Sequence, residues 1–476
     1  MTSPSFYAVT LSFLALASSW TSAAERPNIV FFYADDLGYG DLACYGSPVA
    51  QTPVLDQLAA EGTRFTQFYV SHCVCSPTRA SAITGQFPSR HRIFGHLAYL
   101  SYNQSRKMPD WLDVEAPSFP RALQKAGYRT AMIGKWHLGG GSGRRFKRKD
   151  LANSDADYSQ RSGKITINHP DAPSVDRYGF DHVRTTFGNS PTWKRAEPWP
   201  EPHETYPYLS KEWSTWSSRA IADETIQFLK KHLGSKGKQP FYVNVWFKDV
   251  HTVLLPTEEM RKPFRDLEEK PQVHYAMVRY MDSQIGRVID TLDELKLSEN
   301  TLVLFSSDNG AKDYGGSNDP LRDWKHSLYE GGIRVPLIVR WPGQVPADRV
   351  DKDSVLNIVD LVPTLANLTS AKMPEGYESD GEDIAAAFRG QPFKRKKPQF
   401  WHYPAKSPAL AVRIGNWKLL TDPDKKNEQL YDLTADIGET NNLAAQNPEM
   451  VADLRRQLSD WYRKTGLNDL KPFKSD

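Results

Sequence analysis

Four apolar runs that end in polar residues constrain the fold of this chain more than any other feature. They lie within residues 28–36, 128–139, 240–251 and 300–310, and their polar ends read ADD, GKWH, KDVH and SSDN. Helical patterns lie between them, and strands that alternate with helices form a mostly parallel sheet covered on both faces. Ligands of such sheets bind beyond the carboxyl ends of the strands. The four polar ends are therefore expected to converge at one edge.

Two segments between these runs are expected to be helices. Residues 52–65 read as one helix. Residues 273–297 place six apolar side chains at helical spacing: Val278, Met281, Ile285, Val288, Leu292 and Leu295. That spacing indicates a long helix with one buried face. The predicted fold class is α/β, with a large, mostly parallel sheet sandwiched by helices.

The character of the chain changes near residue 392. Short strand-like runs separated by turns follow, and then a helical stretch over residues 447–466. A length of 476 residues is enough for one large domain and a smaller one. We therefore expect a main domain over residues 25–392 and a small C-terminal α+β subdomain, a short antiparallel sheet plus a helix, over residues 393–476.

Residues 1–24 are typical of a secretory signal peptide. Their apolar run, residues 6–16, is too short to span a bilayer, and small residues that resemble a cleavage site follow it. The alternative is an ordinary apolar N-terminus, because no Lys or Arg precedes the run. A net charge of +3 does not point to nucleic acid. We expect a secreted or periplasmic protein with no membrane span and no nucleic-acid partner.

The chain has three cysteines, and two of them, Cys73 and Cys75, lie one residue apart. Exported proteins usually use cysteines in pairs, so an odd number leaves at least one that is free or chemically special. Residues from Cys75 onward can begin a helix, because Pro77 suits a first helical turn. Arg79, one turn further on, can bind an oxyanion.

The polar strand ends carry the ligands of a hard cation. Asp35 and Asp36 follow one strand, and Asp308 and Asn309 follow another. Carboxylate and amide oxygens without a His or Cys cluster suit calcium or magnesium, although such pairs are also common in turns and caps. Further strand ends and loops supply cations: Lys135, His137, Lys248, His251 and Lys325. Cations gathered around a hard metal describe a pocket for a small tetrahedral oxyanion.

These residues resemble one family, the formylglycine-dependent sulfatases of the alkaline-phosphatase superfamily. The signature of that family is Cys-x-Pro-x-Arg followed by Thr-Gly, and this chain has it over residues 75–79 and 84–85. Motifs in family order cover essentially all of the mature chain: NIVFFYADDLGYGD, GKWHLG, YGFD, SSDNG, YEGGIRVPLIVRWPG and GNWKLL. The resemblance identifies residues 25–392 as a sulfatase catalytic domain with an alkaline-phosphatase-like fold.

The resemblance implies a mechanism. A separate maturation enzyme would oxidise Cys75 to formylglycine (3-oxoalanine), whose hydrate attacks sulfur and whose second hydroxyl then expels sulfate. One calcium ion would lie beside it, held by Asp35, Asp36, Asp308 and Asn309. Arg79 would orient the hydrate, and His137 would assist the elimination. Lys135 and Lys325 would bind sulfate oxygens, and His251 would protonate the leaving alcohol.

The chain departs from the family at two places. Thr78 stands where Ser or Ala is common, and His251-Thr252-Val253 replaces the frequent His-x-Pro. With Cys75 assigned to formylglycine, Cys44 and Cys73 are left as a possible disulfide pair.

A sulfated poly- or oligosaccharide is the expected substrate. An insertion rich in aromatic and basic residues can stack on sugar rings and meet extra sulfates: Trp193, Lys194, Trp199, Trp213 and Trp216. The alternative is that these aromatic residues anchor a long loop. Further expected substrate contacts are Lys248, Asp249, His96, Trp324 and His402. Two other functions remain open: a phosphodiester or phosphonate hydrolase of the same superfamily, and a secreted carbohydrate-binding protein with a degenerate site.

Overall fold

The computed structural model describes residues 26–98, 100–139, 172–186, 211–236 and 239–474. Within them, nine strands form one mixed sheet. In order across the sheet these are β4 (His182–Thr186), β3 (Arg129–Lys135), β5 (Phe241–Trp246), β1 (Asn28–Ala34), β6 (Thr301–Ser307), β7 (Arg334–Arg340), β2 (Thr63–Tyr69) and β8 (Arg349–Asp351), while β9 (Leu356–Asn357) pairs with β2. Five strands from β4 to β6 are parallel, and β7 runs antiparallel to both β6 and β2. The predicted fold class is confirmed.

The central strand β1 explains why its sequence is a continuous apolar run. Every residue of β1 is buried, because apolar layers cover both faces of the sheet. Ile29, Phe31 and Tyr33 face one layer, and Val30 and Phe32 face the other. Parallel strands buried on both faces lose the alternation of apolar and polar residues that marks a half-exposed strand.

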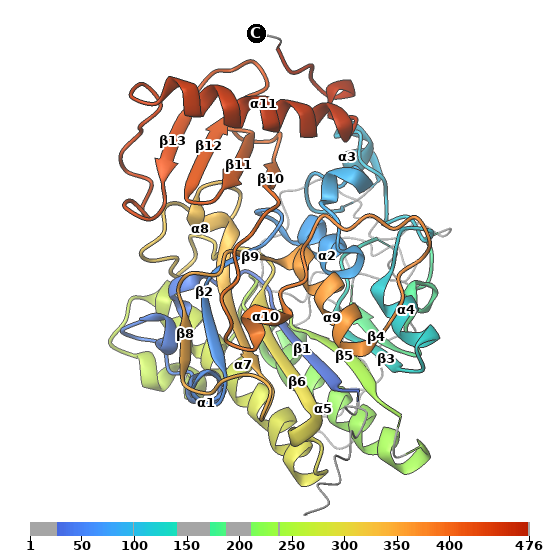
Figure 1. Cartoon of the computed structure of the whole chain (residues 1–476). Helices are drawn as coiled ribbons and strands as arrows, with labels where there is room; N and C mark the ends of the chain where they lie inside the picture. Colours follow the sequence, from blue (N-terminus) through green and yellow to red (C-terminus); the bar gives the residue numbers. More distant parts are fainter. Residues whose placement is uncertain (1–25, 99, 140–171, 187–210, 237–238, 475–476) are drawn as a thin grey trace, which may run out of the picture.

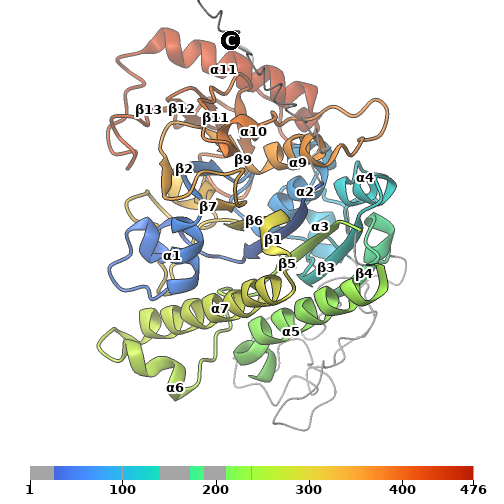
Figure 2. The same cartoon turned by 60° about the horizontal axis from the view of Figure 1, so that its bottom comes forward.

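Helices cover the two faces of the sheet (Figures 1 and 2). One layer contains α1 (Pro53–Ala60), α5 (Lys211–Lys236) and α7 (Glu269–Glu294), and the other contains α2 (Cys75–Thr84), α4 (Phe119–Lys125) and α9 (Leu361–Thr369). Shorter helices are α3 (Leu100–Ser105), α6 (Glu258–Arg261), α8 (Glu330–Ile333) and α10 (Ala385–Phe388). Single turns of 3₁₀-helix lie at Tyr39–Asp41, Ala43–Tyr45, Pro88–His91, Val175–Tyr178, Lys262–Phe264, Ser298–Asn300, Ile358–Asp360 and Leu467–Asp469.

The two predicted helices had different outcomes. The long helix is confirmed as α7, which begins four residues earlier than expected and buries Val278, Met281 and Ile285. The helix expected over residues 52–65 is too long, because the chain turns after Ala60 and enters β2 at Thr63. At this turn a Cβ on Gly62 would lie 2.2 Å from the carbonyl oxygen of Val339, so only glycine lets the backbone approach β7 this closely.

The C-terminal α+β unit is present as expected (Figure 1). Four antiparallel strands lie in chain order, and α11 (Pro448–Lys464) packs against them: β10 (Gln399–His402), β11 (Leu410–Ile414), β12 (Trp417–Thr421) and β13 (Gln429–Asp432). The boundary predicted at residue 392 lies between α10 and β10. The subdomain shares the apolar core of the α2 face, and the Trp401 indole N–H donates to the carbonyl of Val70 at 2.7 Å.

Two expectations about particular side chains are wrong. Cys44 and Cys73 do not form a disulfide, because Cys73 lies in the apolar layer of α2 and Cys44 packs against the opposite layer; all three thiols are free. Trp213 and Trp216 do not belong to a substrate-facing insertion, because both lie on α5. Trp213 is buried in the core, and Trp216 packs edge-on against Tyr280 of α7.

Several expectations concern residues outside the described ranges. These are the signal peptide, Trp193, Lys194 and Trp199. Over the described residues, no helix combines the length and the apolarity that crossing a membrane requires.

Candidate active site

The polar ends of four strands meet at one edge of the sheet, as the sequence predicted. Backbone hydrogen bonds beyond the strands join these ends: Asp35 N–H donates to the carbonyl of Asp249 at 3.0 Å, and Asp308 N–H donates to that of Ala34 at 3.2 Å. Asp36 has a left-handed φ of 63°. This turn breaks the alternation of a strand, so that two successive aspartates can face the same site.

Carboxylates crowd this edge, and they are buried. One ligand atom from each of Asp35, Cys75 and Asp308 lies within 4.8 Å of the others, and the same is true of Asp35, Asp36 and His251. The three aspartates are at most 4% exposed. Asn309 joins the group by donating from Nδ2 to Asp36 Oδ1 at 2.8 Å.

Three buried cations face these carboxylates. Lys135 Nζ donates to Asp35 Oδ2, and Lys325 Nζ donates to Asp36 Oδ1. Arg79 donates from Nε to Asp308 Oδ2 at 2.9 Å and from Nη1 to the carbonyl of Lys135 at 2.7 Å. The Arg79 guanidinium therefore fixes both the strand end that carries Lys135 and the carboxylate that follows β6.

The charges shift the pKa values of the aspartates in opposite directions. Burial raises the pKa of Asp35, but the charges of Lys135, His251 and Arg79 outweigh burial and hold it far below its usual range. Burial likewise acts on Asp36, where Lys325 is the main opposing charge and the pKa is lowered. Burial and the neighbouring Asp35 raise the pKa of Asp308 well above its usual range. A cation bound beside Asp308 would favour the ionised form of this carboxylate.

Two buried oxygens at this edge are available to a cation. Asp35 Oδ1 and Asn309 Oδ1 have no hydrogen-bond partner, although neither is in contact with solvent. Buried polar atoms usually have a hydrogen-bond partner, so buried oxygens without one are candidate ligands of a cation. Together with the carboxylates they form the all-oxygen donor set that calcium and magnesium prefer. The residues present therefore fit a hard divalent cation.

Cys75 lies beside this cluster as the first residue of α2, which confirms that a helix begins there. Its Sγ is 3.2 Å from Nδ1 of His137, and Nε2 of His137 donates to the carbonyl of Leu97 at 3.0 Å. Burial, followed by the charges of Lys135 and Arg79, lowers the pKa of His137 far below its usual value. The imidazole is therefore neutral, and its Nδ1 can accept a proton from the side chain at position 75.

His251 lies at the more open side of the site. Its side chain is 34% exposed, and its Nε2 is 3.7 Å from Asp36 Oδ2. Nδ1 donates to the carbonyl of Thr252 at 2.6 Å, so the loop that replaces the usual His-x-Pro still holds the ring. Burial lowers the pKa of His251 to about 4, against the opposing pull of Asp36.

Three of the five expected substrate contacts are buried within the protein. Lys248 Nζ donates to the carbonyl of Val253, and Asp249 Oδ2 accepts hydrogen bonds from Ser217 and Ser218 of α5. Both residues therefore brace the His251 loop. His402 is 5% exposed and packs in the core, between Phe94 and Tyr462.

The other two expected contacts remain partly exposed. Trp324 directly precedes Lys325, and His96 lies against the ring of Tyr102. Burial lowers the pKa of His96 to about 2. Sequence reasoning missed His326, whose Nδ1 is 3.0 Å from the Tyr403 hydroxyl of the subdomain. Its position directly after Lys325 was the available signal.

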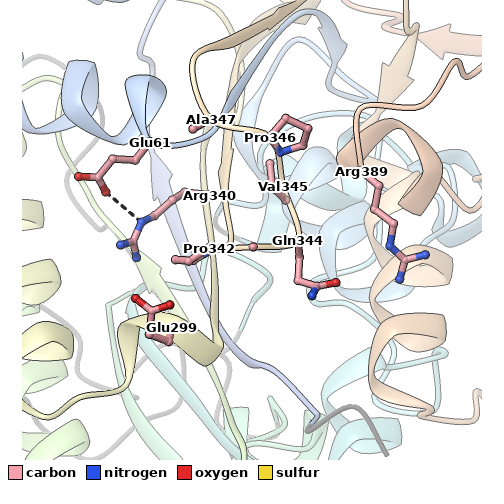
Figure 3. Close-up of a pocket in the computed structure, with 10 residues that line it drawn as sticks. Glu61, Glu299, Arg340, Pro342, Gln344, Val345, Pro346, Ala347 and Arg389 are labelled. Atoms are coloured by element: carbon pink, nitrogen blue, oxygen red, sulfur yellow. Dashed lines mark hydrogen bonds and ion pairs between the residues drawn. The ribbon is translucent and has the colours of Figure 1, made fainter. Parts of the chain in front are cut away.

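A cavity lies elsewhere on the molecule (Figure 3). It has a volume of about 680 Å³ and is lined by Glu61, Glu299, Arg340 and the loop 342–347, among others. Because Arg340 ends the antiparallel strand β7 beside Val303, this cavity is at the opposite edge of the sheet from Asp308. None of the strand-end residues described above lines this cavity. The candidate active site is therefore the cluster at the other edge of the sheet.

Comparison with known proteins gives matches along most of the chain. The family model described as Sulfatase matches residues 27–371, and the model described as N-sulphoglucosamine sulphohydrolase, C-terminal, matches residues 323–464. An N-acetylgalactosamine-6-O-sulfatase of Bacteroides thetaiotaomicron is 28% identical, over 91% of this chain and 93% of that protein. Human arylsulfatase A is 30% identical, over 95% of this chain and 86% of its own length.

Solved structures share the fold. The crystal structure of Ps i-CgsB in complex with k-i-k-neocarrahexaose is 26% identical and covers 92% of both chains, with a TM-score of 0.72. The crystal structure of the putative sulfatase yidJ from Bacteroides fragilis is 25% identical and covers 93% of this chain and 96% of that one, with a TM-score of 0.71.

Proposed function

The chain belongs to the sulfatase family, and we propose that it removes sulfate from a sulfated carbohydrate with calcium and a formylglycine made from Cys75. The observation that carries the proposal is the environment of Cys75. Its Sγ lies within 4.8 Å of oxygens of Asp35 and Asp308 and 3.2 Å from a neutral imidazole. A nucleophile, a metal site and a base thus share one buried edge.

Asp35, Asp36, Asp308 and Asn309 would hold the calcium ion. When bound, calcium would polarise sulfate oxygens and favour the ionised form of the nucleophile. Asp35 Oδ1 and Asn309 Oδ1 support this assignment, because they offer the cation two buried oxygens that accept no hydrogen bond from the protein. Arg79 keeps Asp308 in place by a hydrogen bond from Nε and an ion pair from Nη2, both to Asp308 Oδ2.

A formylglycine hydrate would supply one hydroxyl for attack on sulfur and a second hydroxyl for release of sulfate. His137 is placed to take a proton from the side chain at position 75 through its Nδ1. Lys135 and Lys325 would bind sulfate oxygens, since both ammonium groups are buried and positioned by aspartates. His251, the most exposed of these groups, would protonate the leaving alcohol, with Asp36 favouring its charged form.

A carbohydrate substrate is supported by the relatives. One similar protein is named as an N-acetylgalactosamine-6-O-sulfatase, and one similar structure contains a neocarrahexaose. Trp193, Lys194 and Trp199 are further candidates for sugar contacts. We also propose that the protein is secreted or periplasmic and that a formylglycine-generating enzyme matures it.

Desulfation of a panel of defined sulfated saccharides tests the proposal, with the released position identified by NMR. Wild-type protein with formylglycine verified by mass spectrometry should release sulfate, and Cys75→Ala should release none. Turnover by Cys75→Ala would overturn the role of Cys75. Faster hydrolysis of an aryl phosphodiester than of an aryl sulfate would favour a phosphodiesterase, and saccharide binding without turnover would favour a binding protein.

A further inference from the structure

The loop of residues 322–330 carries Lys325 to the active site. The main domain holds this loop by two backbone hydrogen bonds: Lys325 N–H donates to the carbonyl of Ala311 at 2.9 Å, and His326 N–H donates to that of Cys73 at 3.1 Å. These bonds tie the loop to the chain just before Cys75 and just after Asn309. Side chains of the loop make further contacts with the C-terminal subdomain.

The C-terminal subdomain supplies those contacts. Side chains along the whole loop are bonded to it: Arg322 to Tyr431 at 3.1 Å, Asp323 to Lys406 at 3.0 Å, His326 to Tyr403 at 3.0 Å, Tyr329 to Gln429 at 2.7 Å and Glu330 to Lys418 at 2.9 Å. Residues from three separate parts of the subdomain, the segment after β10, strand β12 and strand β13, therefore hold one short loop. The loop lies between the two parts of the protein rather than on the surface of one.

One of these contacts is a fully buried charge cluster. Lys418 Nζ, on β12, lies 2.9 Å from Glu330 Oε1 and 2.9 Å from Glu439 Oε1, and all three side chains are 0% exposed. The second oxygen of Glu439 accepts the backbone N–H of Glu330 at 2.6 Å. On the other side of Glu330, Oε2 accepts from the Tyr69 hydroxyl at 2.5 Å and is 3.4 Å from Arg334.

These buried charges hold Glu330 in one position relative to Lys418 and Glu439. A buried ammonium between two carboxylates is costly to separate, because each group would remain desolvated without its partner. Burial raises the pKa of Glu330, but the charges of Lys418, Arg334 and Arg413 outweigh it and hold that pKa at about 2. Glu330 is therefore ionised, and the subdomain binds both its Oε1, through Lys418, and its backbone N–H, through Glu439.

We propose that Lys418 is a positioning residue of the sulfatase reaction, which holds Glu330 and thereby places Lys325 against Asp36. The inference rests on the proposed role of Lys325 in binding sulfate. Lys418 does not touch the reacting atoms. It acts through Glu330, five residues after Lys325, in a loop whose His326 is bonded to the backbone of Cys73. The C-terminal subdomain is thus a working part of the active site.

Charge-matched variants of Lys418 test the proposal. Lys418→Met leaves two buried carboxylates, so it is paired with the double variant Lys418→Met/Glu439→Gln, which removes one charge of each sign. Lys418→Arg is the conservative variant, and Lys464→Met, an exposed lysine of α11, is the control. For each, kcat and KM for a sulfated substrate are measured together with amide hydrogen exchange of residues 322–330.

We expect the double variant to fold and to lose kcat by about 10- to 100-fold, because small misplacement of a charged group is costly. KM should change by less than about threefold, since the substrate pocket itself is intact. Exchange should rise in residues 322–330 and stay unchanged in α2, and Lys418→Arg should restore part of both signals. Lys464→Met should match the wild type.

Wild-type kcat and exchange in a folded double variant would overturn the proposal, and so would a loss of kcat without faster exchange in the loop. The exchange measurement needs no substrate. It therefore tests the tether separately from the proposed function, whose own failure would show as a wild-type protein that releases no sulfate.

Discussion

Replacing Lys135 by methionine tests the charge balance of the active site. Lys135 is 2% exposed, and its ammonium donates to Asp35, which is wholly buried. Methionine keeps most of the apolar stem and removes the charge. The change lies outside the Cys75–Arg79 signature, so it should leave maturation of Cys75 intact.

The structure gives the size of the effect. Removing one partner of a buried ion pair costs about 3–5 kcal/mol. Asp35 retains Arg79, whose Nη2 is 3.9 Å from Asp35 Oδ1, so we expect the lower end, about 3 kcal/mol, in calcium-free protein. Calcium beside Asp35 would replace part of the lost charge, so the deficit should shrink when calcium is present. Loss of one positioned donor to the sulfate should lower kcat by about 10²- to 10³-fold.

Urea unfolding in EGTA and in calcium, together with sulfate release, measures both effects. Lys125→Met is the matched control, because Lys125 is exposed at the end of α4. An equal loss of stability with and without calcium would refute the placement of the ion beside Asp35. A Lys135→Met enzyme with wild-type kcat would refute the role of Lys135 in binding sulfate.

Three further expectations can be measured directly. Burial raises the pKa of Glu439 to about 7 from its ordinary 4.5, so the folded state holds a proton that the unfolded state loses, and this stabilisation fades as the pH rises from 4.5 to 7. Glu439→Gln should remove this pH dependence, about 3 kcal/mol, in unfolding curves across that range. EGTA should abolish sulfate release and lower the melting temperature, and calcium at 100 times its Kd should restore about 2.7 kcal/mol. Gly310→Ala should cost about 1–3 kcal/mol or more and impair sulfate release, because its Cβ would lie 1.8 Å from the carbonyl oxygen of Gly331, whereas Gly438→Ala, with no contact below 3.6 Å, should not.

The strands and their polar ends could be predicted because burial on both faces leaves a continuous apolar signal. The aspartates after β1 and β6 follow from that signal, since the carboxyl ends of neighbouring parallel strands meet at one edge. The helix over residues 52–65 was wrong because local periodicity does not report the approach of Gly62 to β7.

The surroundings of polar residues could not be predicted in the same way. Asp249 carries a carboxylate after a strand, as Asp35 does, yet two serines of α5 bind it. His402 was expected to contact the substrate, but its ring packs against Phe94 in the core. Whether a polar side chain faces a ligand or a distant part of its own chain depends on tertiary contacts, which no single-sequence pattern records.

The position of β1 has a consequence for the order of events during synthesis. Its two neighbours, β5 and β6, begin at residues 241 and 301, so a growing chain contains Asp35, Asp36 and Cys75 long before it contains Asp308. In the finished protein Cys75 is 2% exposed. An enzyme that modifies Cys75 would therefore act on the chain before it has folded. Once β6 has been synthesised and has paired with β1, Cys75 would be buried and no longer accessible to that enzyme.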